Sequence, residues 1–173
     1  MEPKTVSETK VEIAELMLPE HANAMGNVHG GTIMKIVDNA AGIVARRHAH
    51  MNVVTASVDR IDFLSPSYIG NLVFAKASLN YTGTTSMEIG VRVEAESLES
   101  GTHTHIASAY LTYVALDKND DPSEVPEVIP TKPEEKRRFR EAKKRKEIRK
   151  KRLEDLKEMR RVCIERPDHC KVE

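Results

Sequence analysis

Hydrophobic residues recur with different periods along residues 1–117, and the period predicts the type of each element. Loose alternation predicts a first strand over residues 5–17, and a stretch rich in Asn, His and Gly over residues 20–31 predicts a loop. Residues 32–49 are apolar on most faces and end in Arg46-Arg47-His48, cations that favour the C-terminal end of a helix dipole. This segment predicts a buried helix.

Beyond this helix the hydrophobic period becomes two. The clearest example places Met87, Ile89 and Val91 on one face of a strand and the charged residues between them on the other. Four strands are expected, over residues 52–66, 71–81, 86–97 and 105–117. One apolar helix and a mainly antiparallel sheet predict an α+β domain of order β-α-β-β-β-β, in which the sheet wraps the helix.

A proline-rich linker over residues 122–133 separates this body from a basic C-terminal segment. Residues 134–163 predict a solvent-exposed helix, which is a candidate to pack on a neighbouring subunit. Its apolar stripe is narrow and consists of Leu153, Leu156, Met159 and Cys163. We therefore expect one domain over residues 1–130 and a basic helical extension over residues 131–173.

Charge is divided unevenly between these two parts. The 27 Lys and Arg equal the 27 Asp and Glu in number, but residues 131–173 carry a net charge of about +8 and residues 1–130 about −8. No apolar run is long enough to span a membrane, and the N-terminus lacks the pattern of a signal peptide. Both cysteines lie near the C-terminus, so no disulfide framework is expected for the body. These features predict a cytoplasmic protein without a membrane partner.

Several common signatures of catalysis are missing from the sequence. There is no G-x-S-x-G elbow, no phosphate-binding loop and no G-x-G-x-x-G after a strand. The pairs His48/His50 and His103/His105 each place two imidazoles close together, but no third metal ligand is evident. No metal site is therefore predicted, and these histidines are interpreted as ordinary surface or loop residues.

Two features at the predicted helix are candidates for chemistry. Gly30 and Gly31 stand at its start, where unpaired N–H groups and the helix dipole can hold a developing oxyanion; a flexible glycine turn is the alternative. Asp38 lies two turns into the apolar helix, where burial would raise the pKa of a carboxyl towards the range of a general base. The alternative is a structural carboxylate, paired with Arg60 or Asn39.

Three ordered blocks of sequence resemble a known family. GNVHGGTIMKIVDNAAGIVARRHA, VVTASVDRIDFLSP and YTGTTSMEIGVRVEAE are similar to the acyl-CoA thioesterases of the hotdog fold, in particular the broad-range hydrolases related to the brain-type mammalian enzyme and its short bacterial relatives. The resemblance covers about residues 7–145. It implies an antiparallel sheet around a long central helix. It also implies a homo-oligomer of paired hotdogs, commonly a trimer of dimers (a hexamer), with active sites at subunit interfaces.

The same resemblance implies a reaction and roles for particular residues. The reaction is hydrolysis of an acyl-CoA thioester to the free acid and CoA, with no cofactor beyond the CoA of the substrate. Asp38 acts as general base or as nucleophile, and N–H groups near Gly30 and Gly31 stabilise the oxyanion. Asn27, supplied by the other subunit, positions water or the carbonyl. A symmetric pair of chains presents each residue twice and so forms two sites.

Residues that bind CoA are also implied by the resemblance. They fall on three segments. These are the strand after the helix, with Ala56, Ser57 and Val58; the TSMEI block, with Thr85, Ser86 and Met87; and the basic segment Arg140–Arg145, in which Lys144 or Arg145 contacts a phosphate. The first three offer a strand edge to the pantetheine amides. A basic extension suits a ligand with several phosphate charges.

Two other functions are compatible with such a domain. The first is a module that senses acyl-CoA without hydrolysing it and contacts nucleic acid through its basic helix. That helix has a single aromatic residue, Phe139, and no recognised nucleic-acid-binding signature, so a nucleic acid partner is not expected. The second is a hotdog dehydratase, which requires a His beside an acid, here His29 and Asp38.

Overall fold

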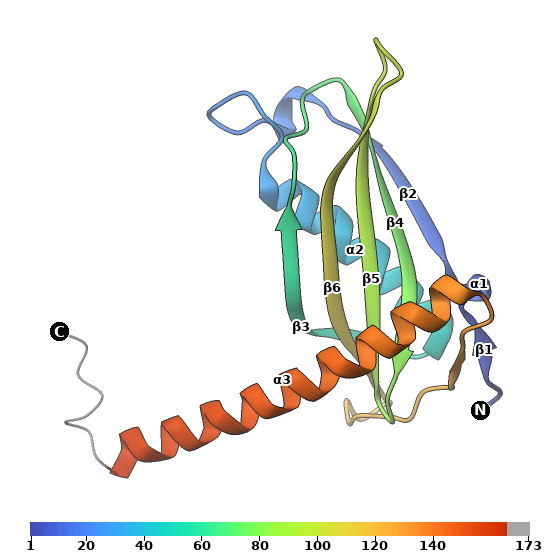
Figure 1. The fold of residues 1–173 in the computed structure, drawn as a ribbon, viewed down its shortest axis with the longest axis vertical. Coiled ribbons are helices and arrows are strands. Elements are labelled where there is room, and N and C mark those ends of the chain that lie inside the picture. The colour runs from blue at the N-terminus through green and yellow to red at the C-terminus, as the bar shows by residue number, and fades with distance from the viewer. Residues whose placement is uncertain (166–173) are drawn as a thin grey trace.

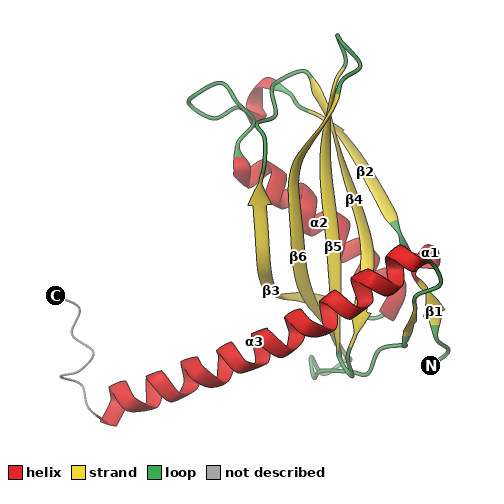
Figure 2. Ribbon diagram, in the orientation of Figure 1, coloured by secondary structure: helices red, strands yellow, loops and turns green. Residues whose placement is uncertain are grey.

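The computed structural model describes residues 1–165 (Figures 1 and 2). Its elements are β1 (Lys4–Thr5), α1 (Val6–Thr9), β2 (Val11–Leu16), the 3-10 helix η1 (Pro19–His21), α2 (Gly30–Ala49), β3 (Asn52–Phe63), β4 (Asn71–Thr82), β5 (Ser86–Ser97), β6 (His103–Leu116), β7 (Val128–Ile129) and α3 (Pro133–Glu165). Within the described residues, no helix is long and apolar enough to cross a membrane.

Five strands form one antiparallel sheet that curves around α2, in the order β2-β4-β5-β6-β3 (Figure 1). The core lies between the concave face of this sheet and one face of α2. On that helix face the buried residues are mostly small or β-branched, which allows the sheet to approach closely: Ile36, Val37, Ala40, Ala41, Val44 and Ala45. The predicted wrapping of one helix by an antiparallel sheet is confirmed, and β3 is an edge strand.

Helix α2 begins two residues before the predicted start and buries only one of its faces. His29 caps it, because its Nδ1 accepts a hydrogen bond from the N–H of Gly31 at 2.8 Å. The opposite face, which includes Met34, Asp38 and Ile43, is exposed in the single chain. The expectation of a helix buried nearly all round is therefore wrong for one chain, since the sheet covers only the face rich in alanine.

The N-terminal segment departs from the prediction of one strand over residues 5–17. Val6–Thr9 forms a helical turn, because the carboxylate of Glu8 accepts hydrogen bonds from the N–H and the Oγ1 of Thr5, both at 2.6 Å. The strand proper is β2. The short strand β1 pairs in parallel with β7, which lies in the segment predicted to be a linker only.

The first half of α3 packs on the outer face of the sheet, opposite to α2, and the second half projects away (Figures 1 and 2). Ala142 is fully buried there, and the rings of Phe139 and Tyr81 lie 5.1 Å apart between centroids. The prediction of a solvent-exposed helix is thus wrong for this half. Further along α3, three residues of the predicted apolar stripe, Leu153, Leu156 and Met159, are exposed. The side chain of Cys163, the fourth residue of that stripe, lies outside the described part, as does Cys170.

His48 is fully buried, so its interpretation as a surface residue is wrong. Its Nε2 lies 2.7 Å from the carbonyl oxygen of Pro126, and its own carbonyl accepts a hydrogen bond of 2.8 Å from Nζ of Lys4. Burial lowers the pKa of the imidazole below its usual range. His48 therefore ties the end of α2 to the proline-rich segment and to β1.

Candidate active site

Asp38 projects from the exposed face of α2 and is held by two hydroxyl groups. Its Oδ1 accepts one hydrogen bond from Oγ1 of Thr55 at 2.8 Å and another from the phenol of Tyr113 at 2.6 Å. The expectation of a buried carboxyl is wrong for the single chain, in which Asp38 is exposed. The sequence-based alternative partners differ as well, because Arg60 pairs with Asp62 at 2.6 Å.

The surroundings of Asp38 form an open pocket of about 310 Å³. It lies between α2, β3 and β6, and the residues lining it include Asn39, Ile43, Arg46 and Val53. In the pocket wall, burial and the hydrogen bond to Asp38 raise the pKa of the Tyr113 phenol, which therefore remains a hydrogen-bond donor at neutral pH. This arrangement orients one oxygen of the carboxylate and leaves space in front of the group.

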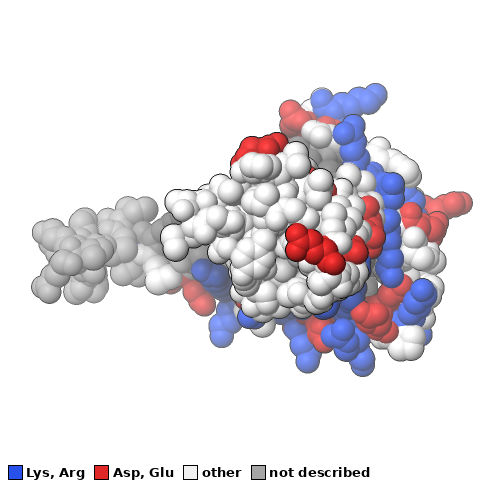
Figure 3. Space-filling view, turned by 90° about the horizontal axis from the view of Figure 1, so that it is seen from above, with Lys and Arg blue, Asp and Glu red and all other residues white. Residues whose placement is uncertain are grey.

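Asn27 lies in a second pocket, of about 380 Å³, at the end of the molecule where loops follow β2 and β3. The same pocket contains Asn23, whose Oδ1 accepts hydrogen bonds from the N–H groups of Met25 at 2.8 Å and Asn27 at 3.2 Å. Viewed from above, much of the surface at this end is uncharged, with acidic groups within it and cations towards its edges (Figure 3). Within one chain, Asn27 and Asp38 therefore line different pockets.

The two glycines at the start of α2 differ in the availability of their N–H groups. The N–H of Gly31 is bound by the capping imidazole of His29. The N–H of Gly30 donates to no group among residues 1–165, and Gly30 lines the same pocket as Asn27. Of the two predicted oxyanion donors, Gly30 is thus the one whose N–H can reach a ligand.

The position of His29 also bears on the dehydratase alternative. Its Nδ1 is engaged as the helix cap. Asp38 follows nine residues later, which is about 13 Å along the axis of a helix. His29 and Asp38 of one chain therefore cannot form the acid–base pair that a dehydratase requires.

The three residues predicted on β3 lie on a free sheet edge. Ala56 is exposed, Ser57 is half-buried and Val58 is 54% exposed. Among residues 1–165, β3 pairs only with β6, so its other edge presents backbone groups that are available for a further strand or an extended ligand. The structure thus places these residues where a pantetheine chain or a second subunit could bind.

Thr85 and Ser86 lie half-buried at the turn between β4 and β5, whereas Met87 is 1% exposed and belongs to the core. The side chain of Met87 therefore lies out of reach of a ligand at the surface. Nearby, Nζ of Lys146 lies 5.0 Å from the ring centroid of Tyr81. An added Cβ at Gly83 would collide with this Nζ, so the ammonium group lies directly over the turn.

On α3 the two predicted phosphate contacts have different environments. Lys144 is exposed. Arg145 is directed at the sheet, where its Nη2 lies 2.6 Å from Oε1 of the buried Glu88 and its guanidinium 3.9 Å from the ring centroid of Tyr110. Sequence reasoning missed Lys146, although it is the next residue of the same basic run.

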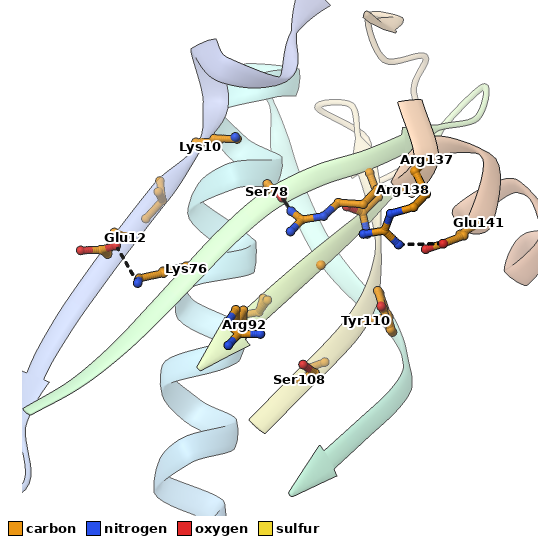
Figure 4. A pocket seen from close by; sticks show the side chains of 15 residues that line it. Lys10, Glu12, Lys76, Ser78, Arg92, Ser108, Tyr110, Arg137, Arg138 and Glu141 are labelled. Atoms are coloured by element: carbon orange, nitrogen blue, oxygen red, sulfur yellow. Dashed lines mark hydrogen bonds and ion pairs between the residues drawn. The ribbon is translucent and has the colours of Figure 1, made fainter. Parts of the chain in front are cut away.

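A further pocket, of about 520 Å³, lies on the outer face of the sheet beneath α3 (Figure 4). Its cations are largely engaged, since Lys76 lies 2.5 Å from Glu94 and Arg137 2.7 Å from Glu141. None of the predicted site residues lines it. Across residues 1–165 there is also no group of three or more His, Cys, Asp or Glu side chains that could hold a metal ion.

Comparison with known proteins identifies the family. Residues 25–102 match the model of the Thioesterase superfamily. The acyl-CoA hydrolase of Staphylococcus aureus, solved with butyryl coenzyme A, coenzyme A and coenzyme A disulfide, is 36% identical and superimposes with a TM-score of 0.85, over 94% of this chain and 99% of that one. The chain belongs to the thioesterase superfamily, and the predicted hotdog fold is confirmed.

Two other comparisons bear on length and assembly. Acyl-coenzyme A thioesterase 11 of Mus musculus is 44% identical over 142 residues, which are 82% of this chain but only 24% of that protein. The chain therefore spans about a quarter of this curated relative. An apo-hexameric acyl-CoA thioesterase is 37% identical with a TM-score of 0.86, over 88% of this chain and 98% of that one.

Structures of the S. aureus enzyme also include variants in which one Asp, one Asn or one Thr is replaced by Ala. In that enzyme the replaced Asn precedes the Asp by 15 positions, and the replaced Thr follows it by 17.

Proposed function

We propose that this protein hydrolyses acyl-CoA thioesters to the free carboxylic acid and CoA, with Asp38 as the general base. The observation that carries the proposal is the carboxylate of Asp38, held through Oδ1 by Thr55 and Tyr113 in an open pocket. The likeness to an acyl-CoA hydrolase solved with CoA ligands supports the choice of substrate.

The reaction needs only water and groups of the protein. Asp38 takes a proton from water as the water oxygen attacks the thioester carbonyl carbon. The carbonyl oxygen becomes an oxyanion, which the N–H of Gly30 from the partner chain stabilises at the positive end of that chain's α2. The carbon–sulfur bond then breaks, and the CoA thiolate leaves and takes up a proton. No cofactor or metal takes part in these steps. Direct attack by Asp38, through an anhydride, is the alternative.

The complete site is proposed to form between two subunits. Asn27 and Asp38 line different pockets of one chain, so a partner chain has to supply one of them. The part of the free β3 edge that precedes Ala56, with the exposed side chain of Val54, offers a surface on which a second chain can pair. A trimer of such dimers is consistent with the hexameric relative.

The spacing of the variants in the S. aureus enzyme supports a different Asn from the one predicted. In this chain Asn23 precedes Asp38 by 15 positions and Thr55 follows it by 17, the same spacing as in that enzyme. Asn23 also shares a pocket with Asn27 and Gly30. We therefore propose Asn23 as the amide that positions water or the carbonyl, with Asn27 as its neighbour in the loop.

CoA is proposed to extend from the edge of β3 towards α3. The backbone of Ala56, Ser57 and Val58 would pair with the pantetheine amides, and Thr85 and Ser86 would contact the ligand at the β4–β5 turn. Exposed Lys144, together with Lys146 over that turn, would bind the phosphates. Residues 1–130 then form the thioesterase domain, and the extension of residues 131–173 contributes cations. We propose a cytoplasmic location for this activity.

The experiment that tests this function is thiol release from a panel of acyl-CoAs by the wild type, Asp38→Asn and Asp62→Asn. Asp62 is a matched control, because it is a carboxylate on the neighbouring strand paired with Arg60. We expect Asp38→Asn to lower kcat by about 10²–10⁴-fold and Asp62→Asn to leave it unchanged. Calorimetry with CoA checks that Asp38→Asn still binds. Wild-type protein that binds CoA without releasing thiol would contradict the proposal and support the sensing module.

A further inference from the structure

We propose that Tyr113 is a positioning residue that anchors Oδ1 of Asp38 and thereby leaves Oδ2 as the atom that takes the proton from water. This inference rests on the proposed function, since it assigns the working atom of the proposed base. Tyr113 stands on β6, where its ring is buried and its hydroxyl lies in the wall of the pocket in front of Asp38, and it was not among the residues indicated by the sequence.

The phenol reaches Asp38 from inside the protein. Tyr113 is 3% exposed, and its hydroxyl lies 2.6 Å from Oδ1 of Asp38 and 2.9 Å from the carbonyl oxygen of the same residue. The side chain of Tyr113 lies against α2 at Gly42, where an added Cβ would be 3.5 Å from the hydroxyl oxygen. A buried ring with few accessible rotamers thus delivers one O–H group to the reactive carboxylate.

The two donors to Asp38 meet the same oxygen. Thr55 approaches Oδ1 from β3 at 2.8 Å, and Tyr113 approaches it from β6. Among residues 1–165, no group donates a hydrogen bond to Oδ2. Because a carboxylate with one oxygen held from two elements has a defined orientation, Oδ2 has a fixed direction and a free lone pair. That combination is what a general base needs.

Few other groups near Asp38 could orient its carboxylate. Besides Asp38, the only residues with an ionisable side chain that line the pocket are Tyr113 and Arg46. Arg46 lies on α2 eight residues further on, about 12 Å along the helix axis, and it is exposed. The hydrogen bonds from Tyr113 and Thr55 are therefore the interactions in this pocket that orient the carboxylate.

The test measures kcat and KM for one acyl-CoA between pH 4.5 and 9 in the wild type, Tyr113→Phe and Tyr110→Phe. Tyr110 is a matched control, since it lies on the same strand but on the outer face, against Arg145. Losing the phenol should remove one of the two anchors of Oδ1, so that Oδ2 no longer has a fixed direction towards the bound water. The plateau kcat should fall by about tenfold, with KM changed less than twofold. Tyr110→Phe should match the wild type.

A folded Tyr113→Phe variant with an unchanged plateau kcat would overturn the inference. If Tyr113→Phe does not fold, as judged by circular dichroism, Thr55→Val replaces it. That variant loses the other donor to Oδ1, and the same fall in the plateau kcat is expected. An unchanged plateau kcat would again overturn the inference.

Asp38→Asn separates this inference from the proposed function. Hydrolysis retained in Asp38→Asn would remove the proposed base altogether. Hydrolysis lost in Asp38→Asn, with Tyr113→Phe indistinguishable from the wild type, would leave the base in place and overturn only the role of Tyr113. When Tyr113→Phe is added to Asp38→Asn, the residual rate should not fall further, because Tyr113 acts through Asp38.

Discussion

Arg145 of α3 and Glu88 of β5 form a salt bridge across the outer face of the sheet, with Nη2 2.6 Å from Oε1. The carboxylate side chain is 2% exposed, and Nδ2 of Asn80 adds a longer hydrogen bond of 3.3 Å to it. A second guanidinium, that of Arg149, binds Asp59 one turn further along α3. These pairs attach the first half of the basic helix to the domain.

Arg145→Ala should destabilise the fold because it leaves the buried Glu88 without its cation. The expected loss in the free energy of unfolding is about 3–5 kcal/mol, measured by urea denaturation. Arg137→Ala is the control, since its pair with Glu141 is exposed on both sides, and its loss should stay below about 1 kcal/mol. An Arg145→Ala variant as stable as the wild type, with a raised KM, would instead support the predicted contact of Arg145 with CoA phosphate.

Asn23→Ala and Asn27→Ala should differ in their effect on kcat. We expect a loss of about 10²-fold or more for Asn23→Ala and a smaller one for Asn27→Ala, as measured by thiol release. Because Oδ1 of Asn23 also holds the loop through Met25, Asn23→Asp is needed as a second variant. It keeps an acceptor for the loop and loses the amide donor. The reverse ranking of the two alanine variants would restore the predicted role of Asn27.

Lys146→Ala should raise KM for acyl-CoA by about 5–10-fold with kcat unchanged, because a phosphate contact is made equally in the ground state and the transition state. Lys144→Ala should act in the same way. Lys157→Ala, on the projecting part of α3, is the control and should match the wild type. An acyl-pantetheine substrate, which lacks the nucleotide phosphates, should not distinguish any of these variants. An equal rise in its KM would exclude phosphate binding as the cause.

His48 should make the stability of the fold depend on pH. Burial lowers the pKa of the folded imidazole, so below about pH 6.5 only the unfolded chain takes up this proton. Stability is therefore full above pH 6.5 and falls towards acid, by at most about 1.4 kcal/mol per pH unit. His48→Gln can keep a donor for Pro126 but cannot titrate, so the difference in Tm between pH 8 and pH 5 should be smaller than in the wild type.

Identical dependence in the wild type and His48→Gln would show that the buried imidazole does not govern acid stability.

The sequence alone was sufficient for the secondary structure of the body and for the family. Period-two alternation located the four long strands, and the run of small apolar residues located α2, because both patterns depend on neighbours along one element. The same local reasoning failed at Val6–Thr9, where the carboxylate of Glu8 caps a helical turn. It also failed at His48, whose burial depends on Pro126, a residue 78 positions away.

Identifying Asp38 needed only its unusual place on an apolar helix, together with the resemblance of the surrounding block. Its partners could not be read from the sequence, because Thr55 and Tyr113 meet its Oδ1 only once β3 and β6 pair beside α2. The salt bridge of Arg145 with Glu88 could not be predicted from the sequence for the same reason. A cation in a basic run favours phosphate by its charge alone, and only the packing of α3 on the sheet brings it to Glu88. Local pattern thus determined the elements and the candidate carboxylate, and tertiary contacts decided which groups hold that carboxylate and which cations stay free for a ligand.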